Sequence, residues 1–216
     1  FTVSACPMLD INILPVEEVD SQTSQILDAA QAYLFTSANG VRAASHHGLT
    51  QNPERPVFAV GPVTANACKA AGFQTVSEAG GDVRSLVEMI KGTNTPHISD
   101  ALVYISGRDQ TGNLVEQLCD AGYDAASLVL YRADKIPAFP DNIATQLISG
   151  EIDSVMFYSS RTAKHFVDLA TLAGIKLSMT AYCLSEAVAK ILRQAGVENI
   201  KVAATKTEES MLALLV

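Results

Sequence analysis

Short apolar runs alternate along the chain with Ala-rich segments whose apolar residues recur at helical spacing. The runs are rich in Val, Ile, Phe and Tyr, most of them end in Gly, Ser or Thr, and several of the helical segments end in Gly. Runs that are apolar throughout are typical of strands buried on both faces of a parallel sheet. The pattern therefore predicts an α/β fold with helix-covered parallel sheets. The clearest predicted strands cover 33–37, 57–61, 102–107, 155–160, 180–185 and 200–205.

Two strand-to-helix units of the first half recur in the second half. The segment 34–44 has the same pattern as 156–166, and 60–73 has the same pattern as 184–197 at nearly the same offset. Ser and Thr cap helices in many proteins, which explains part of the similarity. The shared offset favours a duplication, and so two similar α/β units.

Two extended apolar segments, 5–15 and 127–137, do not fit this alternation, and both close with Pro. We interpret them as the two strands of a hinge. On this interpretation residues 16–126 form an inserted α/β lobe, while residues 1–4 and 138–216 form the second lobe. Because ligands often bind between domains, we expect the substrate in a cleft between the lobes.

Composition narrows the function classes. Of 216 residues, 48% are hydrophobic and 18% charged, which excludes a disordered chain. The net charge of −8 makes nucleic acid and anionic membrane surfaces poor partners. No apolar run approaches the roughly 20 residues that span a bilayer. Four scattered cysteines without CxxC spacing indicate reduced thiols in a cytoplasmic protein, with no metal site. The chain begins in mid-strand at Phe1, so we expect a further segment upstream.

Small and hydroxylated residues follow the predicted strands. In open parallel sheets, ligands bind beyond the carboxyl ends of the strands. The helices that begin there offer unpaired backbone N–H groups and partial positive charge, which hold anions. One such residue alone is ordinarily a helix cap worth about 1 kcal/mol, so the prediction depends on the whole set. The candidate anion-binding residues are Thr36, Ser37, Gly61, Thr64, Ser106, Gly107, Ser159, Ser160 and Ser185.

The common catalytic motifs GxSxG, GxxxxGK[ST], GxGxxG and HExxH do not occur in the sequence. We interpret the pair His46 and His47 as surface residues and expect no histidine catalysis. Arg108 follows a predicted strand and could meet a carboxylate, although a surface ion pair with Asp109 is the alternative. Tyr131 lies near the predicted hinge, where a phenol either packs in an interface or donates a proton.

Five segments, at 34–44, 57–73, 106–109, 129–133 and 157–163, together resemble the uroporphyrinogen-III synthase family in order and spacing. The resemblance covers nearly the whole chain. It implies a cofactor-free, cytoplasmic, monomeric lyase of heme and tetrapyrrole biosynthesis, which cyclises hydroxymethylbilane to uroporphyrinogen III with inversion of ring D and loss of water. It also implies two flavodoxin-like lobes joined by a two-stranded β hinge, and a transient hand-over of substrate from hydroxymethylbilane synthase.

The resemblance also implies residue roles. Tyr131 matches the family tyrosine and would assist loss of the bilane hydroxyl. The strand-end residues, with Arg108 and Thr207, would bind the acetate and propionate groups. The chain departs from the family in lacking the opening strand with its Thr-Arg-Pro segment and the helix after it. It departs also in Lys206, which stands before Thr207 where the family commonly has proline. The loop at 61–65 has the pattern GxxTA, and in its second copy Ser185 stands in the place of Gly61 and Val188 in the place of Thr64.

Two other functions fit parts of the pattern. A non-enzymatic two-lobed module that closes on a small anion would share the hinge and the strand-end loops, but the sequence shows no secretory signal. A flavin or phosphate binder would need an aromatic sandwich near a Gly-rich loop, whereas the chain has no Trp and shows no such loop. The first of these is the main alternative to the lyase.

Overall fold

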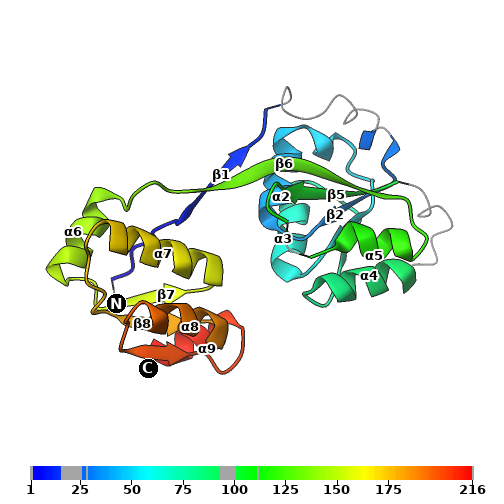
Figure 1. Cartoon of the computed structure of the whole chain (residues 1–216). Coiled ribbons are helices and arrows are strands. Elements are labelled where there is room, and N and C mark those ends of the chain that lie inside the picture. The colour runs from blue at the N-terminus through cyan, green and yellow to red at the C-terminus, as the bar shows by residue number, and fades with distance from the viewer. Residues whose placement is uncertain (1, 16–25, 28, 93–100, 111, 216) are drawn as a thin grey trace. The chain divides into compact units, whose positions relative to one another are not determined.

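The computed structural model describes residues 2–15, 26–27, 29–92, 101–110 and 112–215, which divide into two compact units. Unit 1 comprises Phe1–Asp10 with Asp134–Val216, and unit 2 comprises Ile11–Ala133. Both have the mixed α/β fold with parallel sheets that the apolar pattern predicts (Figure 1). Among the described residues, no helix has the length and apolar character needed to cross a membrane.

A six-stranded sheet with the order β1-β6-β5-β2-β3-β4 forms the centre of unit 2. All neighbours from β6 to β4 are parallel. The chain builds outward from β2 to β4 and then returns to the other side of β2 with β5, so the order reverses between β2 and β5. The strands are β1 Leu9–Ile13, β2 Ala32–Phe35, β3 Val57–Ala59, β4 Val76–Glu78, β5 Leu102–Gly107 and β6 Ala125–Lys135.

Helices cover both faces of this sheet. Side chains alternate along β2, so Tyr33 and Phe35 pack on one face while Leu34 packs on the other. Helices α2 and α3 supply the buried partners of the first face, and α4 and α5 those of the second. The helices are α2 Ala38–His46, α3 Pro62–Ala70, α4 Val83–Gly92 and α5 Leu114–Asp120, with a 3₁₀ turn at Leu49–Gln51.

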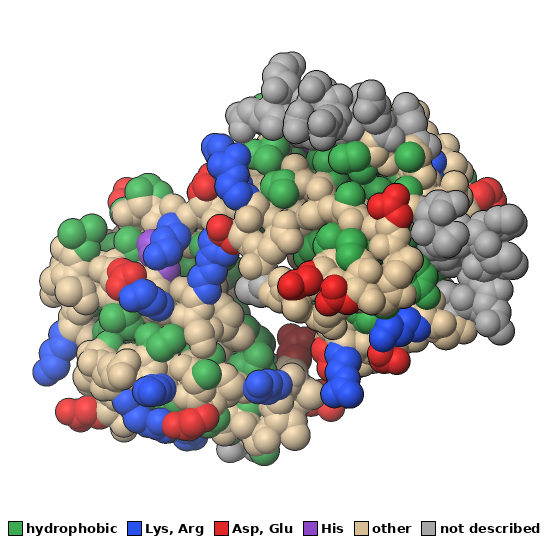
Figure 2. All heavy atoms as spheres, turned by 45° about the vertical axis from the view of Figure 1, so that its right-hand side comes forward, with side chains coloured by type: hydrophobic (Ala, Val, Ile, Leu, Met, Phe, Trp, Pro, Cys, Tyr) green, Lys and Arg blue, Asp and Glu red, His purple; other side chains and the backbone are tan. Residues whose placement is uncertain are grey.

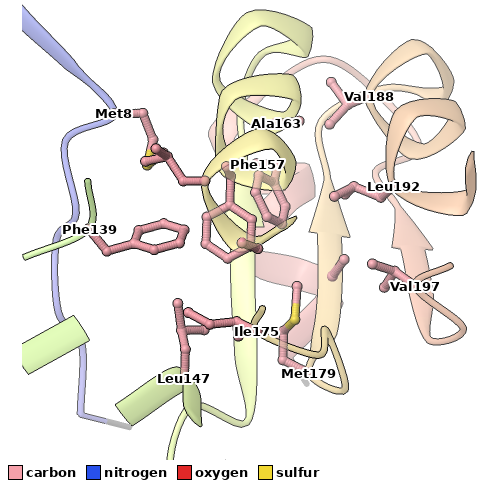
Figure 3. Packing of buried hydrophobic residues seen from close by; sticks show 14 of the residues in the cluster. Met8, Phe139, Leu147, Phe157, Ala163, Ile175, Met179, Val188, Leu192 and Val197 are labelled. Atoms are coloured by element: carbon pink, nitrogen blue, oxygen red, sulfur yellow. The ribbon is translucent and has the colours of Figure 1, made fainter. Parts of the chain in front are cut away.

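Unit 1 contains a parallel three-stranded sheet with the order β7-β8-β9. Its core contains Phe166, whose ring centroid lies 5.1 Å from those of both Phe139 and Phe157. Figure 3 labels Phe139, Phe157 and Met8 among the residues of this core. The elements are α6 Asp141–Ser149, β7 Ser154–Phe157, α7 Ser160–Leu172, β8 Thr180–Cys183, α8 Glu186–Gln194, β9 Ile200–Val202, α9 Glu208–Leu212 and a 3₁₀ turn at Ala213–Leu215.

Strands β1 and β6 are neighbours in the larger sheet, and both run from one unit into the other. The Leu14 backbone N–H donates to the Leu130 carbonyl at 2.9 Å, and the Ile136 N–H donates to the Met8 carbonyl at 3.3 Å. The partner number falls as the chain number rises, so the two strands run antiparallel.

The interpretation of both adjacent histidines as surface residues is wrong for one of them. His46 is exposed, but His47 is half-buried, and its ring is hydrogen-bonded to the Leu14 backbone. Its Nε2 atom is buried and has no hydrogen-bond partner among the described residues. Burial lowers the pKa of His47, because the charged imidazolium loses hydration there.

Candidate functional site

The reversal of strand order between β2 and β5 brings two predicted strand ends together. Phe35 pairs with Ile105, so Thr36, the first residue after β2, lies beside Ser106, while β5 continues to Gly107. The carboxyl ends of the strands at such a reversal are where open α/β sheets bind ligands. The structure therefore places part of the predicted set at the preferred binding position of this fold class.

Two consecutive hydroxyl residues at the end of β2 are each next to a tyrosine. Thr36 Oγ1 lies 2.7 Å from Tyr104 Oη. The phenol of Tyr131, on β6, interacts with the side chain of Ser37, which acts to lower the pKa of the phenol. We call Thr36, Ser37, Tyr104 and Tyr131 the hydroxyl cluster. Burial is the main influence that raises the pKa of Tyr131, and the nearby Tyr104 adds to it, whereas the bonds to Ser37 and to the Gly107 backbone act in the opposite direction.

Gly107 is needed because the Tyr131 ring lies against its backbone. A Cβ added to Gly107 would lie 2.7 Å from Tyr131 Cε2 and 2.8 Å from Cζ, closer than real side chains approach. The ladder shifts between Ser106 and Gly107, and this shift sets Gly107 opposite Tyr131. The close approach of this ring gives Gly107 a steric role at the strand end, and its role in binding the substrate stays a prediction.

Ser37 also begins helix α2. Its backbone is extended, and its Oγ accepts a hydrogen bond from the Asn39 N–H at 3.2 Å. The helix packs closely on β5, since a Cβ on Gly40 would lie 3.0 Å from the Ile105 carbonyl oxygen. This packing holds the N-terminus of α2 beside the two phenols.

The neighbouring strand end, after β3, carries Gly61 and Thr64. Gly61 is the N-cap of α3, and an added Cβ there would lie 3.3 Å from Gly81 Cα. The Gly81 N–H donates to the Val60 carbonyl at 2.7 Å, so the two loops lie against each other. Thr64 is 5% exposed in the first turn of α3. This edge is tightly packed backbone.

Ser106 and Arg108 differ in their exposure. Ser106 is only 1% exposed, and its Oγ lies 2.9 Å from Ser127 Oγ and accepts from Gln110 Nε2 at 3.1 Å. Its hydroxyl therefore joins β5 to β6. Arg108 is exposed directly after β5, and its backbone N–H donates to the Tyr131 carbonyl at 2.8 Å.

The predicted residues of unit 1 lie where β7, β8 and β9 give way to helices. Ser159 caps α7 by accepting from the Thr162 N–H at 3.1 Å, and Ser160 is the first residue of that helix. Ser185 occupies the N-cap of α8 without a side-chain cap bond. Thr207 caps α9 by accepting from the Ser210 N–H at 3.3 Å.

Tyr104 was absent from the sequence prediction. It is 8% exposed inside the apolar run of β5, where a tyrosine usually belongs to the core. The sequence signal that could have identified Tyr104 is its hydroxyl, because a buried phenol needs a hydrogen-bond partner and a strand end offers few such partners. Only the strand register identifies Thr36 as that partner.

A hollow of about 290 Å³ lies elsewhere in unit 2. It is lined in part by Tyr33, Leu49 and Arg55, and Arg55 lies over the Tyr33 ring at 5.0 Å. An adjoining hollow reaches Gln31 and Pro56, the residues just before β2 and β3. The hollows thus lie at the amino ends of the strands, away from the hydroxyl cluster, and we assign them no role.

The two units differ in charge. Unit 2 has seven Lys and Arg residues and 13 Asp and Glu residues, a net charge of −6, whereas unit 1 has eight and 10, a net charge of −2. On the face drawn in Figure 2, Lys and Arg side chains are spread over unit 1. Unit 1 is therefore the less repulsive of the two to an anionic ligand.

Comparison with known proteins gives a consistent result. A family model described as uroporphyrinogen-III synthase HemD matches residues 1–213. The fold resembles that of uroporphyrinogen-III synthetase from Helicobacter pylori, with a TM-score of 0.68 and 19% identity over 96% of this chain and 89% of that one. It also resembles a mutant uroporphyrinogen III synthase from Thermus thermophilus, with a TM-score of 0.55 and 21% identity over 97% and 86%. No curated protein matches the sequence significantly.

Proposed function

This chain belongs to the uroporphyrinogen-III synthase family, and we propose that the hydroxyl cluster and Gly107 are the place where it acts on hydroxymethylbilane. It is a cyclising lyase of heme biosynthesis. The alternative of a non-enzymatic anion-binding module is not favoured, since the family match spans nearly the whole chain. The observation that carries the assignment of the site is geometric: Thr36 is bonded to Tyr104, and the Tyr131 ring lies against Gly107, where the strand order reverses.

The reaction begins with loss of the terminal hydroxyl. The pyrrole nitrogen supplies the electron pair that expels this hydroxyl, which leaves as water when it takes a proton. Tyr131 can give that proton because a phenol is protonated at neutral pH. Burial raises its pKa, which keeps it protonated and makes it a weak acid. The resulting azafulvene is attacked by the substituted carbon of ring D, and the spiro intermediate then fragments and recloses with ring D inverted.

A weak acid is enough for this chemistry. The bilane closes by itself to the wrong isomer, so the protein has to hold one fold of the substrate while the bonds form. The substrate carries eight carboxylates, which the backbone N–H groups at helix N-termini can accept. We assign Ser159, Ser160, Ser185 and Thr207 to the binding of acetate and propionate groups, in keeping with the smaller negative charge of unit 1.

We further propose that β1 and β6 form the hinge of two flavodoxin-like lobes. Both strands pass from one unit into the other and are hydrogen-bonded to each other. We expect solution scattering curves to change when the product binds. Identical curves with and without product, together with one arrangement of the units in every crystal form, would contradict the hinge.

The function is tested by a coupled assay. Porphobilinogen and hydroxymethylbilane synthase generate the bilane with and without this protein, and oxidised uroporphyrin isomers I and III are separated by chromatography. We expect isomer III only when the protein is present. If a folded full-length sample gave isomer I alone, the protein would share only the fold of these synthases and not their activity. The transient hand-over from hydroxymethylbilane synthase stays a prediction.

A further inference from the structure

Two tyrosines reach the end of β2 from opposite faces of the sheet. Tyr104 packs in the cluster that α4 and α5 cover, whereas Tyr131 packs against the cluster that α2 and α3 cover. The Tyr104 hydroxyl is bonded to Thr36, and the Tyr131 phenol interacts with the next residue, Ser37. The turn from β2 into α2 is therefore held from both sides by phenols, and only one of the two has a role in the mechanism above.

We propose that Tyr104 is a positioning residue of the reaction, which fixes Thr36 Oγ1 so that the threonine hydroxyl can donate to an oxygen of the substrate. The inference rests on the proposed function of the cluster. A phenol is more acidic than an aliphatic hydroxyl, so Tyr104 is the better donor in the 2.7 Å bond. When Tyr104 donates, Thr36 keeps its own proton free for a second partner.

The burial of the two groups supports this direction of donation. Tyr104 is 8% exposed, so its hydroxyl is committed to the bond inside the protein. Thr36 is half-buried at the strand end and retains an accessible side. The donated hydrogen bonds thus run from Tyr104 to Thr36 and onward, from the core toward the place where the ligand of such a sheet binds.

Tyr104 also acts on Tyr131. When Tyr104 ionises at high pH, its negative charge raises the pKa of the nearby Tyr131 phenol. Removal of the Tyr104 hydroxyl should therefore affect two quantities at once. It should loosen Thr36, and it should shift the titration of Tyr131 to lower pH.

The test uses Tyr104→Phe with Tyr123→Phe as its matched control. Tyr123 is a half-buried tyrosine of the same unit, and its Oη donates to the Ile90 carbonyl at 3.4 Å, away from the cluster. We expect Tyr104→Phe to lower kcat/KM about threefold to tenfold, the usual effect of one positioned hydrogen bond. The control should match the unaltered enzyme.

A double-mutant cycle decides whether Tyr104 acts through Thr36. We expect Tyr104→Phe combined with Thr36→Val to be no worse than Thr36→Val alone, since both changes break the same bond. Additive losses, or a Tyr104→Phe enzyme that behaves like the control, would overturn the proposal. If Tyr104→Phe does not fold, Thr36→Ser must retain the activity that Thr36→Val loses, and equal losses would overturn it.

The second readout does not depend on turnover. Ultraviolet absorbance of tyrosinate is followed against pH, and the difference from Tyr131→Phe isolates the Tyr131 signal. We expect Tyr104→Phe to move that signal to lower pH, whereas an unmoved signal would contradict the coupling of the two phenols. If the unaltered protein made no isomer III, the proposed function would fail, and this titration would still decide the coupling.

Discussion

The ends of β2 and β7 share one local design but differ in what surrounds them. Ser37 and Ser159 follow a buried Phe, have the same extended backbone, and cap the next helix. Ser37 also meets Tyr131, and its neighbour Thr36 meets Tyr104. The additional contact of Ser159 is to Thr162 of its own helix, and the residue in the place of Thr36 is Tyr158, which is 46% exposed.

A turn from a strand into a helix therefore does not by itself bring tyrosine hydroxyls to a strand end. The neighbouring strands decide whether they meet there. In unit 2 the turn lies between β5 and β3, and β5 and β6 supply the two phenols. In unit 1 the turn follows β7, which stands at the edge of the described sheet. We therefore attribute the proton chemistry to unit 2 and carboxylate binding to unit 1.

The largest expected effect follows from Gly107→Ala. The new methyl group would displace the Tyr131 ring and the backbone at this strand end, so the whole hydroxyl cluster would be misplaced against the substrate and not the phenol alone. Misplacement of reacting groups by about 1 Å costs about 100-fold in rate. The measurement is kcat in the coupled assay, with folding checked by circular dichroism. Gly92→Ala is the control, because among the described residues no atom outside its own stretch of helix lies within 4 Å of the added Cβ there. Full activity of Gly107→Ala would show that Tyr131 can move freely.

Tyr131→Phe should have a smaller effect. We expect kcat to fall about tenfold with KM little changed, because positioning supplies most of the rate and the phenol assists only the loss of hydroxyl. Steady-state kinetics on a variant with unaltered circular dichroism makes the measurement. Complete inactivity of a folded Tyr131→Phe enzyme would mean that the acid role is dominant.

The dependence of the activity on pH also tests the acid role of Tyr131. The pKa of Tyr131 is raised in the folded protein, so activity should persist above the ordinary tyrosine pKa of about 10 and fall as the phenol ionises. The contribution of the Tyr131 phenol to the free energy of unfolding changes with pH in the same direction as the activity. It is fully present below a pH of about 10 and is lost as pH rises through the folded-state pKa. The alkaline limb of kcat/KM should disappear in Tyr131→Phe, and its persistence would assign it to another group.

The smallest expected effect is that of Ser185→Ala in unit 1. The Ser185 side chain makes no cap bond, so stability should change by only a few tenths of a kcal/mol. If its hydroxyl holds a substrate carboxylate, KM should rise about threefold with kcat unchanged. A fall in kcat with an unchanged KM would place reaction chemistry in unit 1.

The sequence predicted the α/β fold because its apolar runs and glycine-ended helices are strong local signals. Strands end earlier than predicted wherever the terminal Ser becomes a helix cap, as after Phe35 and after Phe157. Such boundaries depend on where backbone hydrogen bonds change partner, and residue type records that only approximately.

The site was less accessible to prediction, because it depends on strand order. Thr36, Ser37 and Tyr131 carry recognisable local patterns, but their meeting depends on β5 returning beside β2. Tyr104 resembles a core residue in the sequence, and Ser106 resembles a strand-end hydroxyl although β5 continues past it. Register and the ladder shift at Gly107 decide both cases, and neither has a local signal.

The most direct test of the division between the units is the pair Ser37→Ala and Ser159→Ala in the coupled isomer assay. Each variant loses one helix cap, so both should lose about 1 kcal/mol of stability. We predict that Ser37→Ala lowers kcat for isomer III because it also removes the hydroxyl that interacts with Tyr131, whereas Ser159→Ala raises KM and leaves kcat unchanged. Equal losses of kcat in the two variants would contradict the account.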